Sequence, residues 1–250
     1  SIKNHERSPA ISDFSQNNSR VTSFHILRQD REHLRKQLTL HSRWKKTALI
    51  LPLLASEYTN PLNHPVFENI LRQLKDINYV SEIIFGLDRA TEEEALQLRD
   101  LINDFGIQNY TIQWNDGPGF LGIYEKLNEA GFNISEPGKG KNMFLSFGIA
   151  MALGAETIGL IDADIRTFKR VQLDRLFYPV VALNYDFSKA YYSRIKDNQI
   201  YGRVKRLLLD PLLIALKRKF SETKDQKMLN LIDFLLSFKY QLSGEVAFHV

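Results

Sequence analysis

The sequence predicts an α/β protein with a mostly parallel β-sheet flanked by helices, and three observations support this prediction. Residues 48–54 form a continuous apolar run, which is typical of a parallel strand covered on both faces. From residue 47 onwards, runs of this kind alternate with segments in which apolar residues recur every three or four positions. A later apolar run, 157–161, is followed directly by Asp162 and Asp164, which are poor strand residues and therefore mark the end of that strand.

Each expected element has its own local signal. The apolar residues of 66–74 lie on one stripe of a helix. The helix at 90–105 begins with Thr91 and three glutamates, whose charges suit the positive end of a helix dipole. Strands are expected at 48–54, 79–87, 110–114 and 156–161, and further helices at 121–130 and 142–153.

The order of elements changes after residue 170. We expect a helix at 170–182, a strand at 187–192, and two basic amphipathic helices at 203–219 and 223–237. The last part of the chain is therefore predicted to be more helical than the part before it.

The first residues are unlike the rest of the chain. Residues 1–20 are polar and are expected to form a mobile arm. Residues 24–44 combine apolar and basic side chains and predict an amphipathic helix that packs on the domain. A role of this helix at a membrane surface is the alternative.

Composition excludes several classes of protein. The 250 residues are 44% hydrophobic and 25% charged, as in globular proteins, and they include no cysteine. A disulfide scaffold, a thiolate zinc site and a cysteine nucleophile are therefore excluded. No apolar run approaches the roughly 20 residues that cross a bilayer, and the chain has no apolar secretory stretch at its start. We expect a cytoplasmic enzyme or binding protein, whose net charge of +4 suits small anionic substrates as well as nucleic acid.

Asp162 and Asp164 are the most informative residues for function. They flank one small residue at the end of a buried strand, where ligands bind in open α/β sheets. Hard carboxylate oxygens select Mg²⁺ or Mn²⁺, and such ions commonly bind one or two carboxylates together with substrate phosphates. The simpler interpretation is an acidic loop between a strand and a helix.

Polar residues at other strand ends are expected at the same edge of the sheet. Glu57 follows the first strand and Asp88 ends the second. Either can accept hydrogen bonds from a base or a ribose, or can serve as the N-cap of a helix. Lys139 lies in a Gly-Lys-Gly loop before the helix at 142–153, where glycines allow close approach of a ligand and the lysine suits an anion.

Two later motifs give weaker signals. Arg203 lies at the start of a predicted helix, where free N–H groups and a guanidinium suit a carboxylate or phosphate. Glu245 follows Ser243 and Gly244 and can lie in a pocket. The ordinary interpretation of Arg203 is a solvated basic residue at a helix start. The ordinary interpretation of Glu245 is a residue near the end of the sequence that belongs to no site.

Together these segments resemble a known family, the retaining GT-A glycosyltransferases of the glucosyl-3-phosphoglycerate synthase group. The resemblance covers about residues 47–248. The Gly-Lys-Gly and Asp-x-Asp elements are shared with mannosylglycerate synthase, whereas the later elements point to the narrower group. The elements occur in the order Pro52-x-Leu54-x-x-Glu57, Gly138-Lys139-Gly140, Asp162-x-Asp164, Lys189-Ala190-Tyr191-Tyr192-Ser193-Arg194, Gly202-Arg203-Val204 and Ser243-Gly244-Glu245.

The resemblance implies a GT-A, Rossmann-like fold and a set of donor-binding residues. Asp162 matches the acid on the ribose side, and Asp164 matches the acid that ligates Mg²⁺ or Mn²⁺. Lys139 matches the lysine that reaches the nucleotide-sugar, and Asp88 loosely matches a position near the nucleoside. The stretch that cradles uracil is matched by Pro52, Leu54 and Glu57.

It also implies acceptor-binding and catalytic residues. The loop that grips phosphoglycerate is matched by Gly202, Arg203 and Val204, and Lys205 stands where the family often has a threonine. Glu245 matches the glutamate near the transferred sugar, where it orients hydroxyls and stabilises positive charge.

We expect the chain to have three portions, of which the resemblance gives the functions of the second and third. Residues 1–46 form the polar arm and basic helix, 47–170 the half that binds the nucleotide-sugar, and 171–250 the portion that binds the acceptor. The family's pattern continues beyond its Gly-Glu segment and includes a histidine of the metal site. We therefore expect the sequence to continue past Val250, because His249 is too close to Glu245 for that role.

The implied activity is transfer of glucose from UDP-glucose to 3-phosphoglycerate with retention of anomeric configuration, in a compatible-solute pathway. We expect the protein to form a homodimer. We expect it neither to bind nucleic acid nor to associate stably with a membrane. One alternative is a transferase that uses GDP-mannose or another sugar nucleotide, with glycerate or another acceptor. The further alternative is a non-enzymatic nucleic-acid-binding protein. The sequence contains no RNA- or DNA-binding motif, which argues against this alternative.

Overall fold

The structure is a computed structural model that divides the chain into two compact units. The larger unit comprises residues 30–189 and 244–250, and the smaller one comprises 1–29 and 190–243. These boundaries differ from those of the three functional portions expected from the sequence. The division into those functional portions stays a prediction. The structure describes residues 14–16, 21–24, 31–134, 136–191, 194–196, 199–201 and 204–250.

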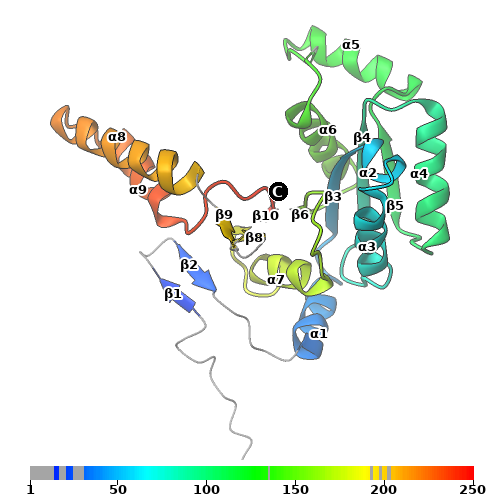
Figure 1. The fold of residues 1–250 in the computed structure, drawn as a ribbon, viewed down its shortest axis with the longest axis horizontal. Coiled ribbons are helices and arrows are strands. Elements are labelled where there is room, and N and C mark those ends of the chain that lie inside the picture. The colour runs from blue at the N-terminus through cyan, green and yellow to red at the C-terminus, as the bar shows by residue number, and fades with distance from the viewer. Residues whose placement is uncertain are drawn as a thin grey trace, which may run out of the picture. The chain divides into compact units, whose positions relative to one another are not determined.

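A six-stranded sheet forms the centre of the larger unit (Figure 1). Its order is β5-β4-β3-β6-β10-β7, in which the neighbours among β3, β4, β5 and β6 pair in parallel. The sheet is therefore mostly parallel, as predicted. The strands are β3 (Thr47–Leu54), β4 (Glu82–Asp88), β5 (Tyr110–Trp114), β6 (Thr157–Leu160), β7 (Phe187–Lys189) and β10 (Val246–His249).

Strand β10 was not predicted from the sequence. It pairs antiparallel with both β6 and β7, so that residues 246–249 form an interior strand next to the edge strand β7. Its four residues are too few for their pattern to be distinctive. The strand predicted at 187–192 is also shorter, because β7 ends at Lys189.

Helices cover both faces of this sheet, as expected. The predicted positions agree with the structure to within a few residues, except that α1 begins at Arg31, with residues 25–30 outside the described part, and that the short helix α2 was not predicted. The helices are α1 (Arg31–His41), α2 (Ser56–Thr59), α3 (His64–Leu74), α4 (Glu92–Asp104), α5 (Leu121–Glu129), α6 (Lys139–Ala152) and α7 (Arg170–Val181), with a 3₁₀ turn at Pro118–Phe120.

Alternation along β4 shows which helices lie on which face. The ring of Phe85 meets Phe67 of α3 edge to face, at 6.3 Å between centroids. The next residue, Gly86, faces Asn142 of α6, and a Cβ there would lie 2.5 Å from Asn142 Oδ1. Because successive strand residues point to opposite faces, α3 and α6 lie on opposite sides of the sheet.

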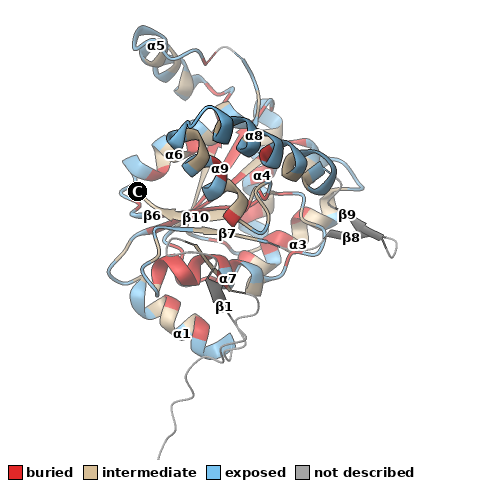
Figure 2. Ribbon diagram, turned by 90° about the vertical axis from the view of Figure 1, so that its left-hand side faces the viewer, coloured by how far each residue is buried: buried red, intermediate tan, exposed pale blue. Residues whose placement is uncertain are grey.

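A buried carboxylate ties α1 to the rest of the unit. Asp174 of α7 is 1% exposed and accepts hydrogen bonds from Tyr79 Oη at 2.7 Å and from Arg35 Nε at 3.0 Å. Buried residues concentrate on the sheet and on α7, whereas α5 has none (Figure 2).

The smaller unit is mainly helical in its described part. An antiparallel helix pair, α8 (Asp210–Glu222) and α9 (Gln226–Ser237), follows a π-helical turn at Lys205–Leu209. This agrees with the two predicted helices. Two short hairpins, which were not predicted, are formed by β1 (Phe14–Gln16) with β2 (Thr22–Phe24) and by β8 (Arg194–Lys196) with β9 (Gln199–Tyr201). Among the described residues no helix is long and apolar enough to cross a bilayer.

Candidate nucleotide-binding pocket

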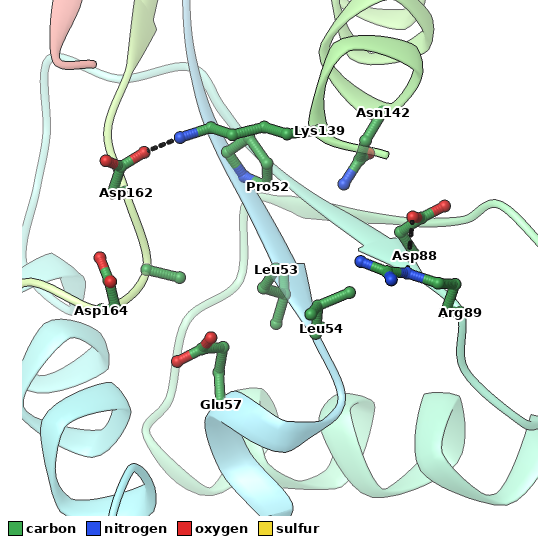
Figure 3. Close-up of a pocket in the computed structure, with 11 residues that line it drawn as sticks. Pro52, Leu53, Leu54, Glu57, Asp88, Arg89, Lys139, Asn142, Asp162 and Asp164 are labelled. Atoms are coloured by element: carbon green, nitrogen blue, oxygen red, sulfur yellow. Dashed lines mark hydrogen bonds and ion pairs between the residues drawn. The ribbon is translucent and has the colours of Figure 1, made fainter. Parts of the chain in front are cut away.

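A pocket of about 210 Å³ opens at the carboxyl ends of β3, β4 and β6 in the larger unit (Figure 3). The strand order reverses beside β3, because the chain runs from β3 outwards to β5 and then returns to β6 on the other side. This is the point at which open α/β sheets bind ligands. The pocket is lined by Pro52, Leu53, Leu54, Glu57, Asp88, Arg89, Lys139, Asn142, Asp162, Ala163 and Asp164.

Seven residues predicted for donor or metal binding therefore line one pocket. They are Pro52, Leu54, Glu57, Asp88, Lys139, Asp162 and Asp164. The sequence placed each of them at a strand end or in the glycine-rich segment, and parallel pairing brings those ends to one edge. Their roles in binding stay predictions.

Asp162 and Asp164 lie just beyond β6, on one side of the pocket (Figure 3). Asp162 Oδ1 accepts a hydrogen bond from Lys139 Nζ in an ion pair whose side chains are 22% and 52% exposed. Asp164 is exposed to solvent. Both carboxylates are thus accessible from the pocket.

Lys139 does not lie in a loop before the helix, as the sequence predicted, but is the first residue of α6. Gly138 is the N-cap and has φ 148° and ψ 173°, a conformation that is costly for residues with a Cβ. The chain therefore enters the helix three residues earlier than the apolar pattern indicated. Lys139 stands at the positive end of α6, which adds to the attraction of an anion there.

Glu57 lies in the first turn of α2, with its carboxyl directed toward Asp164 (Figure 3). Burial raises the pKa of Glu57 above its ordinary value, and the negative charge of Asp164 raises it further. Neither Glu57 nor Asp88 is a helix N-cap, because Ala55 precedes α2 and Thr91 caps α4. The capping alternative is thus ruled out for both acids.

Asp88 belongs to a chain of buried polar side chains that the sequence analysis missed. Asp88 Oδ1 accepts from Asn115 Nδ2 at 3.0 Å, and Asn115 Oδ1 accepts from Gln113 Nε2 at 2.8 Å. Gln113 Nε2 also donates to Asn142 Oδ1 at 3.0 Å, and Asn142 Nδ2 donates to the Gly86 carbonyl at 2.6 Å. Isolated amides carry no sequence pattern, although Asn115 and Asp116 directly after an apolar strand gave a signal of the same kind as Asp162.

The predicted catalytic residue Glu245 lies outside the lining of this pocket. It is 4% exposed and directly precedes β10. Burial lowers the pKa of Lys189, and the charge of Glu245 opposes that shift, so the two side chains interact. The adjacent Gly244 packs against the pocket residue Asp162, because a Cβ on Gly244 would lie 3.0 Å from Asp162 Oδ2.

The predicted acceptor residues belong to the smaller unit. Gly202 and Arg203 lie outside the described residues. Val204 is exposed, and Lys205 Nζ pairs with Asp210 Oδ2 at 2.6 Å.

The charge of the pocket favours a cation. Its lining contains four carboxylates and two basic groups, which gives a formal net charge of −2. A nucleoside diphosphate is itself an anion, so its binding there requires additional positive charge.

The residues present suit a divalent ion held in an open site. Among the described residues, no group of three or more histidine, aspartate or glutamate side chains is arranged to hold a metal. Mg²⁺ and Mn²⁺ commonly use only one or two protein carboxylates and complete their shell with water and phosphate oxygens. Asp164 with Asp162 fits that arrangement.

Comparison with known proteins identifies relatives of this chain. Glucosyl-3-phosphoglycerate synthase of Persephonella marina is 38% identical over 241 residues, which cover 95% of this chain and 57% of that protein. The enzyme of the same name from Methanococcoides burtonii is 30% identical over 232 residues, which cover 91% of this chain and 54% of that protein. The chain thus spans about half the length of these curated relatives. No protein-family model matches it.

Solved structures show the same fold. A crystal structure of glucosyl-3-phosphoglycerate synthase from Mycobacterium tuberculosis with Mn²⁺, UDP and phosphoglyceric acid matches with a TM-score of 0.54 and 19% identity, covering 86% of this chain and 59% of that one. A second, with Mn²⁺, UDP and glucosyl-3-phosphoglycerate, matches with a TM-score of 0.56 and 17% identity, covering 91% and 63%. The chain is therefore a homologue of glucosyl-3-phosphoglycerate synthase and has the mostly parallel α/β fold of the GT-A glycosyltransferases.

Proposed function

We propose that this chain transfers glucose from UDP-glucose to 3-phosphoglycerate with retention of anomeric configuration. The observation that carries the proposal is one pocket that gathers seven residues predicted for donor or metal binding at the switch point of the sheet. The curated relatives carry the name of this activity.

The donor would bind with its diphosphate near Asp162 and Asp164 and its nucleoside toward Asp88. A Mg²⁺ or Mn²⁺ ion held by Asp164 would neutralise charge on the departing UDP. Lys139 would exchange its partner Asp162 for a phosphate oxygen, since its side chain is half exposed and can move. Pro52 and Leu54 supply an apolar surface for the base.

The acceptor would be held by the segment 202–205. Arg203 can grip the phosphate of 3-phosphoglycerate through two N–H donors, which a plain glycerate acceptor does not require. The acceptor hydroxyl oxygen bonds to the anomeric carbon as the bond from that carbon to the UDP oxygen breaks, and the hydroxyl proton passes to the leaving phosphate oxygen. Glu245 would orient sugar hydroxyls and stabilise positive charge at the anomeric carbon.

Release of UDP from UDP-glucose tests this proposal. With Mg²⁺ present, we expect UDP release to require 3-phosphoglycerate and to fall on removal of the metal by a chelator. Glycerate in place of 3-phosphoglycerate should give far less product. A chain that releases no UDP with any acceptor would contradict the proposed activity.

Calorimetric titration with UDP and GDP tests the donor. We expect UDP to bind more tightly, and tighter binding of GDP would support the alternative donor, GDP-mannose. A homodimer and a cytoplasmic location stay predictions, of which the former is tested by light scattering coupled to size-exclusion chromatography.

A further inference from the structure

Arg89 is a pocket residue that neither the sequence motifs nor the resemblance assigned. It directly follows β4, and its side chain is 58% exposed. The guanidinium group points into the pocket near Leu54, on the side away from Asp162 and Asp164 (Figure 3). Arg89 therefore places a cation at the end of the pocket opposite to the two metal-site acids.

The backbone of Arg89 is held in an unfavourable conformation. Its φ is 54°, in the left-handed region that residues with a Cβ rarely occupy. The next residue explains how this is maintained, because Ala90 N–H donates to Asp116 Oδ2 at 3.0 Å and the Ala90 carbonyl accepts from Trp114 Nε1 at 2.8 Å. Residues from the end of β5 thus fix the turn that aims Arg89, and strain of this kind clusters at functional sites.

The side chain of Arg89 is also positioned by the buried carboxylate of Asp88. Its Nε lies 3.4 Å from Asp88 Oδ2, and the other oxygen of Asp88 is held by Asn115. Asp88, Asn115 and Gln113 are all at most 4% exposed and are linked in one hydrogen-bonded chain. Burial of polar groups is costly, so a connected chain that ends on a pocket arginine indicates a positioning role.

We infer that Arg89 binds the nucleoside of the sugar donor, and that Asp88, Asn115 and Gln113 are positioning residues that hold it in place. A guanidinium offers only N–H donors, which suit oxygen acceptors such as the carbonyls of uracil or the hydroxyls of ribose. The diphosphate end of the donor is assigned to Asp162 and Asp164, so the opposite end is left for the nucleoside. This inference rests on the proposed function.

Calorimetric titration of UDP against Arg89→Ala and Arg89→Gly tests the inference. We expect UDP to bind about tenfold to a hundredfold more weakly to both variants, as expected for loss of a charged hydrogen-bond donor. Binding of Mn²⁺ alone, followed by electron paramagnetic resonance, should be unchanged. Arg89→Gly should also fold normally, because glycine adopts a positive φ without strain.

Arg99→Ala is the matched control. Arg99 lies on α4, its side chain is 52% exposed, and it pairs with the adjacent Asp100 at 3.0 Å, much as Arg89 pairs with Asp88. The Arg99→Ala variant should bind UDP like the unchanged protein. Unaltered UDP affinity in both Arg89 variants, or loss of Mn²⁺ binding together with UDP binding, would overturn the inference. Failure of the unchanged protein to bind UDP would instead overturn the proposed function.

A double-mutant cycle tests the positioning residues. Asn115→Ala should weaken UDP binding in the unchanged protein and have little further effect in Arg89→Ala, because its effect passes through Arg89. Equal effects in both backgrounds would show that Asn115 acts independently of Arg89. If Asn115→Ala does not fold, Asn115→Ser, whose side chain is one bond shorter and draws its polar group back from Asp88, is used with the same expectation.

Discussion

Lys139 Nζ bonds to Asp162 Oδ1 although the two residues are 23 positions apart in the sequence. The start of α6 and the end of β6 meet at one edge of the sheet, which brings the lysine and the acid together. With side chains 52% and 22% exposed, this pair adds at most about 1 kcal/mol to stability. The pair therefore has more consequence for binding than for folding.

Lys139→Ala should weaken UDP binding while leaving the fold intact. We expect a loss of about tenfold to a hundredfold in affinity, because a charged donor to the diphosphate is removed. The free energy of unfolding, measured in urea, should change by less than about 1 kcal/mol. Lys217→Ala is the control, since Lys217 of α8 forms a similarly exposed pair with Asp233 of α9. This variant should bind UDP normally. Equal UDP affinities of the two variants would contradict the role given to Lys139.

Asp164→Ala should abolish binding of Mn²⁺ and metal-dependent turnover without unfolding the protein. Asp164 is exposed, so its removal leaves no buried partner without a hydrogen bond. Electron paramagnetic resonance of Mn²⁺ and far-UV circular dichroism provide the two measurements. Asp100→Ala changes an aspartate whose side chain is 65% exposed on α4 and should behave like the unchanged protein. Normal Mn²⁺ binding by Asp164→Ala would remove the metal assignment.

Gly86→Ala should destabilise the protein through contact with α6. The new Cβ would lie 2.5 Å from Asn142 Oδ1 and 2.9 Å from Ser146 Oγ, in a buried region where neither group can move freely. We expect a loss of about 1–3 kcal/mol in the free energy of unfolding.

Gly148→Ala is the control for this substitution. Gly148 lies in α6 with nothing within 4 Å of the added Cβ, so alanine should stabilise the helix by about 0.5–1 kcal/mol. Urea unfolding of both variants gives the comparison, and a neutral Gly86→Ala would show that Asn142 does not pack tightly on β4.

Tyr124 should ionise at unusually high pH. Burial, together with the smaller effect of the negative charges of Asp116 and Asp88, raises the pKa of Tyr124 from 10.0 to about 12. Its hydroxyl also donates to the Asn115 carbonyl at 2.6 Å. The difference in phenolate absorbance between the unchanged protein and Tyr124→Phe should therefore show a midpoint well above pH 10.

The same shift has a consequence for stability. Below pH 10 the phenol is neutral in both the folded and unfolded states, and its contribution is fully present. Between pH 10 and 12 the unfolded chain loses this proton first, so the free energy of unfolding falls as pH rises. The free energy of unfolding of Tyr124→Phe should fall less steeply with pH in this window. Identical slopes for the variant and the unchanged protein would contradict the raised pKa of Tyr124.

The sequence predicted the local elements because their signals are local. The start of α4 was predicted from Thr91 and the acids after it, whose charges suit the helix dipole. The structure adds a capping pair that was not predicted, in which Glu94 Oε2 accepts from Thr91 N at 2.8 Å and Thr91 Oγ1 accepts from Glu94 N at 3.2 Å. Continuous apolar runs identified β3 and β6 because strands buried on both faces need such residues.

The tertiary structure decided which residues share the pocket wall. Gln113 and Asn142 are 29 positions apart and lie on different elements, and their hydrogen bond depends on the packing of α6 against β4 and β5. Arg89 was overlooked for a related reason, because its left-handed backbone is imposed by Trp114 and Asp116 from the next strand.

By itself, the sequence determined the α/β class, the strand ends that carry the acids, and the resemblance that gives these residues their proposed roles. Only the tertiary structure inserted β10 between β6 and β7 and placed Gly244 against Asp162. The physical reason is that periodicity and end signals act over a few residues, whereas strand pairing and the packing of buried amides depend on partners that are distant in the chain.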